Sequence, residues 1–380
     1  MSRLVFERKP VKFAAARLAG ALAPGRGAAV GPLSLESEEL LPLPGPEWLR
    51  LTPLLSGICG SDLALIDGTA SAYFDPLVSY PFTPGHEVVA RTDDDRRVVL
   101  VPVLHCAIRG IDPVCDMCAT GAINLCERVA FGHIDAGLQT GFCTDTGGGW
   151  STGLIAHAAQ LVDVPDDFSD EAAVMIEPTA CAVHAAGRYH GADTVIIGGG
   201  TVGLLTLAAI SARRDNDGTG PVIVSARYTE QRRLAKELGA DIVCTPDEMP
   251  RWVRSLSRSM VIGDQLSGGF ERVVDCVGSS DSLQQALNVV APGGEVQLVG
   301  MPGNVSLELT SLWHREVAIR GCYAYSRDDF LRAIDVVRRF DLGRLVSATY
   351  PLHEYKDALA HAASAGRRGA VKIAFDMRRG

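Results

Sequence analysis

The 380-residue sequence has no excess of positive charge. Its 36 Lys and Arg residues face 45 Asp and Glu residues, which gives a formal net charge of −9. Proteins that bind nucleic acid use basic surfaces to neutralise phosphate groups. The composition therefore argues against nucleic acid as a main partner.

The sequence also lacks a long apolar run. No stretch approaches the roughly 20 apolar residues that a membrane-spanning helix needs, and the first residues, MSRLVFERK, do not have the layout of a secretion signal. We therefore expect no membrane partner and a cytoplasmic location. Hydrophobic residues make up 47% of the chain and charged residues 21%, which is an ordinary globular balance. The length predicts two or three domains.

Cysteine is present in quantity, and four of the ten cysteines crowd into one short span. Without a secretion signal, such a cluster indicates metal binding before disulfides. Cys115 and Cys118 have the spacing of a zinc knuckle, and Cys126 follows closely. Four thiolates would close a tetrahedral structural zinc site and leave no position for a substrate. Cys106 is the candidate fourth ligand, although its distance from Cys115 leaves Asp112 as an alternative.

A second set of metal-ligand types lies elsewhere. Cys59 stands in the segment Gly-Ile-Cys-Gly-Ser-Asp, and His86 and Glu87 end the segment Pro-Gly-His-Glu. Three protein ligands and an open position are typical of a catalytic zinc site. Ser61 could accept a proton from an alcohol bound there. The alternative is that Cys59 is a small buried hydrophobe and His86 a hydrogen-bonded core histidine.

Glu177 is a lone acid in the apolar segment 172–186, which we expect to be helical and broken by Pro178. A buried carboxylate must be paired, hydrogen-bonded or bound to metal. Glu177 is therefore our candidate for the third ligand of the Cys59 and His86 site. Cys181 is the competing candidate.

A dinucleotide-binding pattern begins at the apolar strand 194–197. The strand runs into the glycine-rich segment 198–203 and then into an apolar helix. Glycines here permit a tight turn and a close approach to a pyrophosphate at the helix N-terminus. Strands and helices alternate downstream, which predicts a doubly wound parallel sheet with its ligand at the carboxyl ends of the strands. The candidate cofactor residues are Gly198, Gly200, Thr201, Val202, Gly203, Gly278 and Gly300.

The second strand of this pattern, 222–225, bears on the choice of cofactor. Sites for NAD end this strand with an acid that holds the ribose 2′-hydroxyl. Here the strand ends at Ser225, and Arg227 follows two residues later. Because an Arg can pair with a 2′-phosphate, we predict NADP(H) in preference to NAD(H).

The remaining segments are less specific. Short apolar runs separated by Pro and Gly predict a β-rich, barrel-like domain up to about residue 153. Gly147-Gly148-Gly149-Trp150 suggests a mobile loop whose Trp either lines a substrate pocket or belongs to the core. Residues 317–322 look like a last strand, an edge available for dimer pairing. Residues from about 345 onwards could return to the first domain.

Taken together, the sequence resembles the zinc-dependent medium-chain dehydrogenases, such as the alcohol, sorbitol, threonine and glucose dehydrogenases. The matching motifs occur in the family's order: 57–62, 84–87, the cysteines of 106–126, Glu177-Pro178 and 198–203. The resemblance implies a GroES-like catalytic domain interrupted by a Rossmann domain, an α/β architecture. We expect a catalytic domain over 1–184 with a zinc lobe at about 104–128, a Rossmann domain over 185–325, and a return over 326–380.

The resemblance also implies roles for single residues. Glu177 would complete a catalytic zinc site, Glu87 would be the acid that can approach the metal, and Ser61 would belong to the proton relay. Lys372 would contact the cofactor pyrophosphate. Ala64 stands where many members carry a relay histidine, so the proton would leave by another route.

The implied activity is reversible hydride transfer between an alcohol and NADP(H), with a polyol, a sugar or another alcohol as substrate. The resemblance also implies a homodimer or homotetramer. Two alternatives stay open: a zinc-independent alkene or quinone reductase on the same fold, and a non-catalytic cofactor-binding protein.

Overall fold

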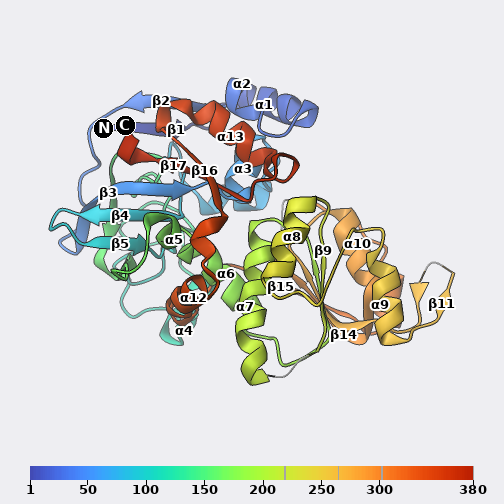
Figure 1. Ribbon diagram of the computed structural model, residues 1–380. Helices are drawn as coiled ribbons and strands as arrows, with labels where there is room; N and C mark the ends of the chain where they lie inside the picture. The colour runs from blue at the N-terminus through green and yellow to red at the C-terminus, as the bar shows by residue number, and fades with distance from the viewer. Residues whose placement is uncertain (218–219, 264, 301–302, 380) are drawn as a thin grey trace. The chain divides into compact units, whose positions relative to one another are not determined.

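The computed structural model describes all residues except 218–219, 264, 301–302 and 380 (Figure 1). The chain forms two units, which are described separately. Unit 1 comprises Met1–Glu177 and Tyr325–Gly380, and unit 2 comprises Pro178–Ala324. Helix α6 (Ile176–Ala186) contains the first crossing between them. The sequence had suggested boundaries at 184/185 and 325/326.

Unit 1 begins with two paired strands separated by helices. Strand β1 (Ser2–Phe6) runs antiparallel to β2 (Leu33–Ser37). Helices α1 (Pro10–Leu22) and α2 (Gly27–Val30) lie between them in sequence. Pro at the start of α1 suits the first helical turn, where its missing N–H has no intrahelical role.

The main sheet of unit 1 has the order β16-β17-β3-β4-β5-β7, with β6 also paired to β3. Most pairings are antiparallel, and β17 from the end of the chain joins β3. The return of the C-terminal segment to the first domain is thus present in the sheet. The strands are β3 (Trp48–Gly57), β4 (Val88–Thr92), β5 (Arg97–Leu100), β6 (Leu154–His157), β7 (Leu161–Asp163), β16 (Val346–Tyr350) and β17 (Lys372–Asp376).

Short helices connect these strands. The remaining α-helices of unit 1 are α3 (Gly60–Ile66), α4 (Asp116–Ala119), α5 (Asp170–Val174), α12 (Arg327–Phe340) and α13 (Tyr355–Ala363). Its 3-10 helices are η1 (Ala72–Leu77), η2 (Ile123–Leu125), η3 (Ala158–Gln160), η4 (Leu342–Leu345), η5 (Leu352–Glu354), η6 (Ala365–Arg368) and η7 (Met377–Arg379).

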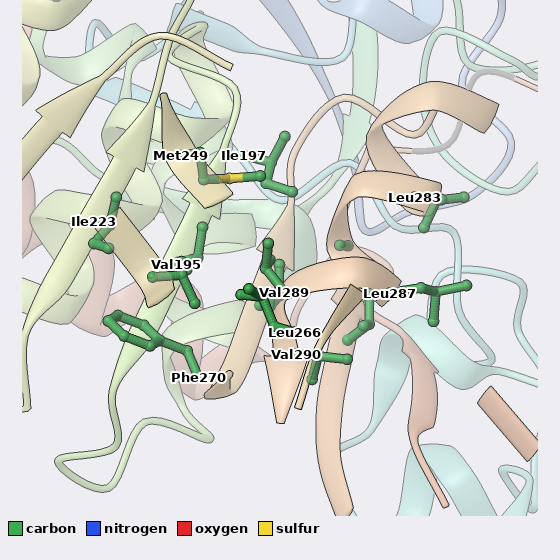
Figure 2. Close-up of a cluster of buried hydrophobic side chains, with 14 of the residues drawn as sticks. Val195, Ile197, Ile223, Met249, Leu266, Phe270, Leu283, Leu287, Val289 and Val290 are labelled. Carbon is green, nitrogen blue, oxygen red and sulfur yellow. The ribbon is translucent and has the colours of Figure 1, made fainter. Parts of the chain in front are cut away.

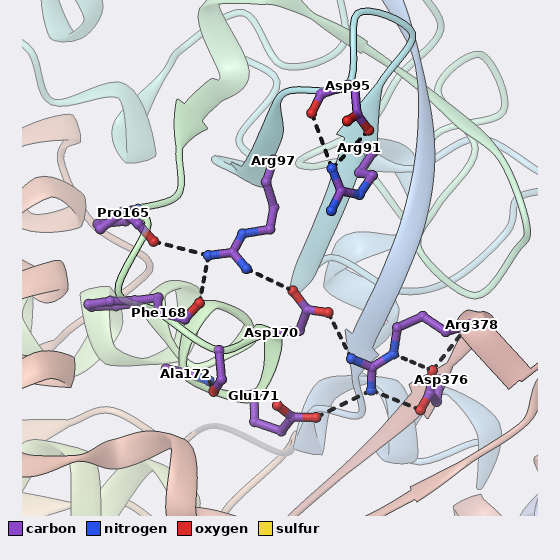
Figure 3. Close-up of polar contacts among 11 residues, drawn as sticks. Arg91, Asp95, Arg97, Pro165, Phe168, Asp170, Glu171, Ala172, Asp376 and Arg378 are labelled. Atoms are coloured by element: carbon purple, nitrogen blue, oxygen red, sulfur yellow. Dashed lines mark hydrogen bonds and ion pairs between the residues drawn. The ribbon is translucent and has the colours of Figure 1, made fainter.

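A network of ion pairs anchors the C-terminal segment (Figure 3). The Asp170 carboxylate at the start of α5 lies 3.5 Å from Arg97 Nη1 on β5 and 2.7 Å from Arg378 Nη1. Arg378 also donates to Asp376, which ends β17 and is 1% exposed. One carboxylate therefore links strand β5 to the end of the chain.

Trp150 belongs to the core of unit 1. Its side chain is fully buried and packs edge-on against Phe375 at 5.1 Å between ring centroids. The Gly149 N–H donates to the Gly85 carbonyl, and the Trp150 N–H donates to Pro84. The segment is thus buried and hydrogen-bonded, and of the two roles left open for Trp150 the structure has the core one.

Unit 2 is a six-stranded parallel sheet of order β10-β9-β8-β13-β14-β15. Numbered within the unit this is 3-2-1-4-5-6, the order of a dinucleotide-binding doubly wound fold. The strands are β8 (Thr194–Ile197), β9 (Val222–Ser225), β10 (Ile242–Cys244), β13 (Phe270–Asp275), β14 (Val290–Leu298) and β15 (Ala318–Gly321), and a separate hairpin consists of β11 (Val261–Ile262) and β12 (Gln265–Leu266). The helices are α7 (Thr201–Asp217), α8 (Thr229–Glu237), α9 (Met249–Ser257), α10 (Ser280–Val289) and α11 (Thr310–His314).

One apolar cluster of unit 2 lies between the sheet and the helices α9 and α10 (Figure 2). Val195 and Ile223 of neighbouring strands, Met249 of α9, and Leu283 and Leu287 of α10 belong to one buried cluster. These residues are at most 1% exposed. The continuous apolar strands read from the sequence are typical of a parallel sheet that is buried on both faces.

Two details refine the expectations from the sequence. The break in the helical segment 172–186 lies at Met175, between α5 and α6, and Pro178 falls within the first turn of α6, where a proline is tolerated. Among the described residues, no helix is both long and apolar enough to cross a membrane.

Candidate metal and dinucleotide sites

The four lobe cysteines lie together in unit 1. The Sγ atoms of Cys106, Cys115, Cys118 and Cys126 are all within 4.8 Å of one another. Asp112 is exposed and does not belong to this group. Of the two candidates for the fourth position, the structure therefore brings Cys106 to the other three.

Backbone amides favour the thiolate form of Cys115, whereas burial raises the pKa of Cys118 and Cys126 in the absence of a metal. The Cys115 N–H donates to Cys106 Sγ at 3.4 Å, and the Arg128 N–H donates to Cys126 Sγ at 3.4 Å. Burial disfavours the Cys115 thiolate, but backbone N–H groups of Glu127 and Cys118 outweigh it, and the pKa of Cys115 falls to about 6. Because thiolates are the zinc-binding form of cysteine, this donor set fits a structural zinc ion.

Arg109 holds the metal lobe to the chain that follows it. Its side chain is completely buried, and its guanidinium donates hydrogen bonds to five backbone carbonyl groups. These are the carbonyls of Leu104, Phe131, Ile134, Asp135 and Gly137, at 2.7–3.1 Å. This role was not predicted from the sequence, because an Arg beside a cysteine cluster is ordinarily a surface residue.

The second group of metal-ligand types is also brought together in unit 1. Ligand atoms of Cys59, His86 and Glu87 lie within 4.8 Å of one another. Cys59 caps the N-terminus of α3, and His86 and Glu87 immediately precede β4. His86 and Glu87 are buried, and Cys59 is half-buried. Ser61 is exposed in the first turn of α3, two residues beyond Cys59.

Asp62 accepts a hydrogen bond from the Cys59 backbone and faces the ring of His86. Its Oδ2 accepts a hydrogen bond from the Cys59 N–H at 2.9 Å, and its Oδ1 lies 3.6 Å from His86 Nδ1. This leaves Nε2 of His86 as the nitrogen available to the cluster. Burial alone would lower the pKa of His86, but the charge of Asp62 raises it well above its ordinary value. A carboxylate behind a ligating imidazole is a recurrent feature of metal sites.

Glu177 lies beside this group. Its carboxylate is buried, and burial raises the pKa of Glu177 to about 7, with His86 and Glu87 close enough to influence it. The hydroxyl of Tyr325, which is also fully buried, donates to Glu177 Oε1 at 2.7 Å. The sequence did not indicate Tyr325, because 147 residues separate the two positions in the chain.

Lys372 pairs with a candidate metal ligand. It is 2% exposed, and its Nζ forms an ion pair with Glu87 in unit 1. The contact with the cofactor pyrophosphate that the family resemblance implies stays a prediction. Gly57 faces the same carboxylate, and a Cβ atom at that position would collide with Glu87 Oε2. Lys372 and Gly57 therefore fix the position of Glu87.

The chemistry of this donor set fits a zinc ion. A thiol, an imidazole and a carboxylate meet in a buried place, with a second carboxylate next to them. His86 Nδ1 and Asp62 Oδ1 are buried and make no hydrogen bond within the described chain. Cys59 and His86 would hold the metal, and Glu87 and Glu177 would supply carboxylate oxygens.

Trp150 forms hydrogen bonds to both of the segments that carry the candidate ligands. Its indole Nε1–H donates to the Gly57 carbonyl at 3.2 Å, two residues before Cys59. Its backbone N–H donates to the Pro84 carbonyl at 3.0 Å, two residues before His86. One buried residue therefore sets the separation of the two segments.

In unit 2, the glycine-rich segment forms a tight loop between β8 and α7. Gly198 has φ +103°, and its N–H donates to the Ser225 carbonyl. A Cβ on Gly203 would collide with the Gly198 carbonyl, whereas a Cβ on Gly200 would meet nothing within 4 Å. The loop is thus closed on the protein side and open at Gly200. Thr201 and Val202 begin α7, whose N-terminus can receive a phosphate.

The loops after β13 and β14 are shaped by Asp275. Its buried carboxylate accepts hydrogen bonds from the N–H groups of Val277 and Gly278, and its carbonyl accepts one from Gly300. Gly278 has φ +71°, and a Cβ on Gly300 would lie 2.7 Å from Cys276 backbone atoms. The structure therefore places both predicted loops at the carboxyl ends of neighbouring strands.

The end of β9 is basic. Arg227 is exposed, and Ser225 has a buried hydroxyl with no hydrogen-bond partner among the described residues. Arg232 Nη1 donates to the carbonyls of Ala226 (3.0 Å) and Arg227 (2.7 Å). Arg232, which the sequence reasoning missed, therefore braces this loop and adds a second positive charge to it.

Two family models match the chain. The alcohol dehydrogenase GroES-like domain matches residues 45–166, and the zinc-binding dehydrogenase model matches residues 202–339. These two descriptions correspond to the β-rich and the parallel-sheet parts of the chain.

Similar proteins cover most of the chain. An L-idonate 5-dehydrogenase of Vitis vinifera is 28% identical over an alignment of 360 positions, and the match covers 89% of this chain and 90% of that protein. An uncharacterized zinc-type alcohol dehydrogenase-like protein of Haemophilus influenzae is 30% identical over 304 residues, 74% of this chain and 77% of that protein.

Solved structures of similar fold also cover most of the chain. The 2R,3R-butanediol dehydrogenase of Bacillus subtilis superposes with a TM-score of 0.70 at 22% identity, over 90% of this chain and 96% of that chain. A Sinorhizobium meliloti protein solved bound to NADP gives a TM-score of 0.69 at 25% identity, with the same coverage. With these matches and the two-part fold, the chain belongs to the zinc-dependent medium-chain dehydrogenases, with a GroES-like domain and a Rossmann domain.

Proposed function

We propose that this protein is a zinc-dependent alcohol dehydrogenase that uses NADP(H). The observation that carries the proposal is the buried group of Cys59, His86 and Glu87, with Asp62 behind the histidine. It occurs in a chain that also has a glycine loop open toward a dinucleotide. A zinc-independent reductase would have no use for this donor set.

Each part would have a defined task. A zinc ion held there would act as a Lewis acid toward an alcohol oxygen, and the nicotinamide would exchange a hydride with the substrate carbon. Cys59 and His86 would hold the metal, with Asp62 hydrogen-bonded to the Cys59 backbone and its charge beside His86. Ser61, exposed on the same helix turn as Asp62, would take the alcohol proton and pass it to solvent, because Ala64 offers no relay.

Metal content tests the proposal directly. Elemental analysis of purified protein should give two zinc ions per chain. The Cys59→Ser variant should lose one zinc and all turnover, and Cys118→Ser should lose the other zinc and stability. One zinc in the wild type, unaffected by Cys59→Ser, would leave the lobe as the only metal site and point to a zinc-independent reductase.

The cofactor preference rests on the end of β9. Arg227 and the braced Arg232 place two positive charges where an acid would hold the ribose of NAD. Arg227→Ala should weaken NADP+ binding about 10- to 100-fold, as expected for loss of one charge-assisted bond, and leave NAD+ binding nearly unchanged. Arg233→Ala is the matched control, because Arg233 lies six residues away on α8 but pairs with Glu230 and Glu237. Equal loss for both cofactors would contradict the NADP proposal.

The substrate proposed is a secondary alcohol of a small polyol or sugar acid. L-idonate 5-dehydrogenase and sorbitol dehydrogenase are among the similar proteins, each 28% identical across 89% of the chain. A panel of polyols, sugar acids, amino alcohols and simple alcohols with NADP+ would test this. Turnover of none of them by protein with two zinc ions would favour a non-catalytic role.

We further propose a homodimer or homotetramer in the cytoplasm. Strand β15 pairs only with β14 among the described strands, and all four of its residues are exposed. An unpaired edge strand is a template for a second copy. Light scattering should give at least twice the chain mass, and a monomer at all concentrations would reject the proposal.

A further inference from the structure

Helix α1 carries an apolar face that no described element covers. Val11, Leu18 and Leu22 are 84%, 72% and 82% exposed. Their spacing of seven and four residues places them on one side of the helix. Side chains of this size are seldom left in water as a continuous stripe, so the stripe calls for a partner.

The opposite face of α1 is fixed to unit 1. Ala16 is fully buried, and Phe13 packs against the core cluster that contains Ile66 of α3. Just beyond the helix, the Asp67 carboxylate accepts hydrogen bonds from the N–H groups of Gly25 and Gly27 at 2.8 and 3.0 Å. The helix therefore cannot rotate to bury its stripe within its own chain.

The charge around α1 is opposite to that of the rest of the protein. Residues 8–35 contain five Lys and Arg residues and no Asp or Glu. This segment thus has a formal charge of +5, and the remainder of the chain, at −9 minus +5, has −14. Figure 1 shows α1 and α2 at the outer edge of unit 1, near α13.

Two of these basic residues flank the stripe. At about 100° per residue, Lys12 lies on one side of the line through Val11 and Leu18, and Arg17 lies on the other. Both side chains are exposed and have no ion-pair partner among the described residues. Arg8 and Lys9, by contrast, pair with Asp75 and Glu7.

We propose that α1 is a docking helix for an anionic lipid surface. An apolar stripe flanked by unpaired basic residues suits the plane of a bilayer, where the stripe enters the headgroup boundary and the cations meet lipid phosphates or carboxylates. A 13-residue helix is about 20 Å long and lies along such a surface without spanning it. This goes beyond the proposed dehydrogenase activity, and it differs from the expectation of no membrane partner, which considered spanning segments.

A second copy of the chain is a poorer occupant. Pairing α1 with α1 across a two-fold axis would bring Lys12 and Arg17 of both copies together, and residues 8–35 offer no acid to neutralise them. Like charges at such a contact oppose association. The same charges favour a surface that is uniformly negative.

Sedimentation of the intact protein with vesicles tests this proposal. We expect binding to vesicles of phosphatidylcholine mixed with phosphatidylserine, little binding to phosphatidylcholine alone, and weakening with added salt. Lys12→Gln with Arg17→Gln should reduce partitioning roughly fivefold per charge. The triple change Val11→Ser, Leu18→Ser, Leu22→Ser should abolish binding.

The matched control is Val261→Ser with Ile262→Ser, which removes two other exposed apolar side chains, on β11. This control should bind vesicles as the wild type does, and every variant should keep its thermal midpoint and its NADP+ binding. Absence of binding by the wild type, equal binding to both vesicle types, or loss of binding only in the β11 control would overturn the proposal. A fall in oligomer size caused by the triple change, without vesicle binding, would assign the stripe to a second copy instead.

Discussion

The substitution Arg109→Met should destabilise the metal lobe more than a substitution of a residue on the surface of the lobe. The substitution keeps an apolar stem of similar length and removes every donor of the guanidinium. Five backbone carbonyls between Leu104 and Gly137 then lose their hydrogen bonds. Three of those bonds lie in fully buried surroundings, where water cannot replace the donor without a change in structure.

The size of the effect follows from those three acceptors. A buried acceptor that loses its partner costs about 1–3 kcal/mol, so three give at least about 3 kcal/mol even at the lower bound. For a unit of this size, about 3 kcal/mol corresponds to a fall of roughly 6–12 °C in the melting temperature. Because the segment 131–137 is held by these bonds, a chelator should also remove the lobe zinc faster.

The assay is thermal unfolding followed by circular dichroism, together with zinc release to a colorimetric chelator. Arg128→Ala is the control, since Arg128 is in the same lobe but its guanidinium makes one exposed bond, to the Pro113 carbonyl at 3.0 Å. The control should change the free energy of unfolding by less than about 1 kcal/mol. Equal melting temperatures for Arg109→Met and Arg128→Ala would refute the role given to Arg109.

Three further predictions concern other parts of the chain. Tyr325→Phe removes the bond to Glu177 and should lower the affinity for one zinc about 10- to 100-fold, measured by competition with a chelator; unchanged affinity would mean that Glu177 is no ligand. Gly203→Ala should abolish NADP+ binding in calorimetry, because its Cβ has no room beside the loop backbone, and normal binding would contradict the loop described above. Arg378 helps to hold the pKa of Asp376 below its usual value, so the pair stabilises the fold above the ordinary carboxyl range, and this contribution is lost as pH falls below about 4. Arg378→Ala should therefore be less stable than wild type at neutral pH, with the difference shrinking in acid; a difference that grows in acid would reverse the assigned sign.

Much of the fold could be predicted because the sequence patterns that specify it involve residues close together in the chain. Val195 and Ile196 lie in an apolar strand that is followed at once by a glycine-rich turn. Because a side chain would not fit at several positions of this turn, the glycines mark the strand, loop and helix within a few residues. The fold class and the family are confirmed by the parallel sheet and by the matching family models. Cys59, His86 and Glu87 were recognisable because ligand chemistry restricts the residue types.

The residues that contact the candidate metal ligands could not be predicted in the same way. Asp62 stands in a known motif, but its contact with His86 depends on the fold. Tyr325 and Lys372 come from the far end of the chain and reach Glu177 and Glu87 only through the return of β17 and the segment before α12. Long-range contacts of this kind leave no periodicity in a sequence. Single-sequence reasoning therefore finds ligands more readily than the residues that hold them.

The Glu177–Tyr325 hydrogen bond joins the two residues at which the chain passes between the units. The chain leaves unit 1 after Glu177 and re-enters it at Tyr325, so these are the residues at the two crossings into unit 2. The Tyr325 hydroxyl lies 2.7 Å from Glu177 Oε1, so a hydrogen bond connects the two places where the chain passes between the units. Since Glu177 adjoins the metal-ligand group, the residue at which the chain leaves unit 1 is itself a candidate metal ligand, and Tyr325 at the other crossing is its hydrogen-bond donor.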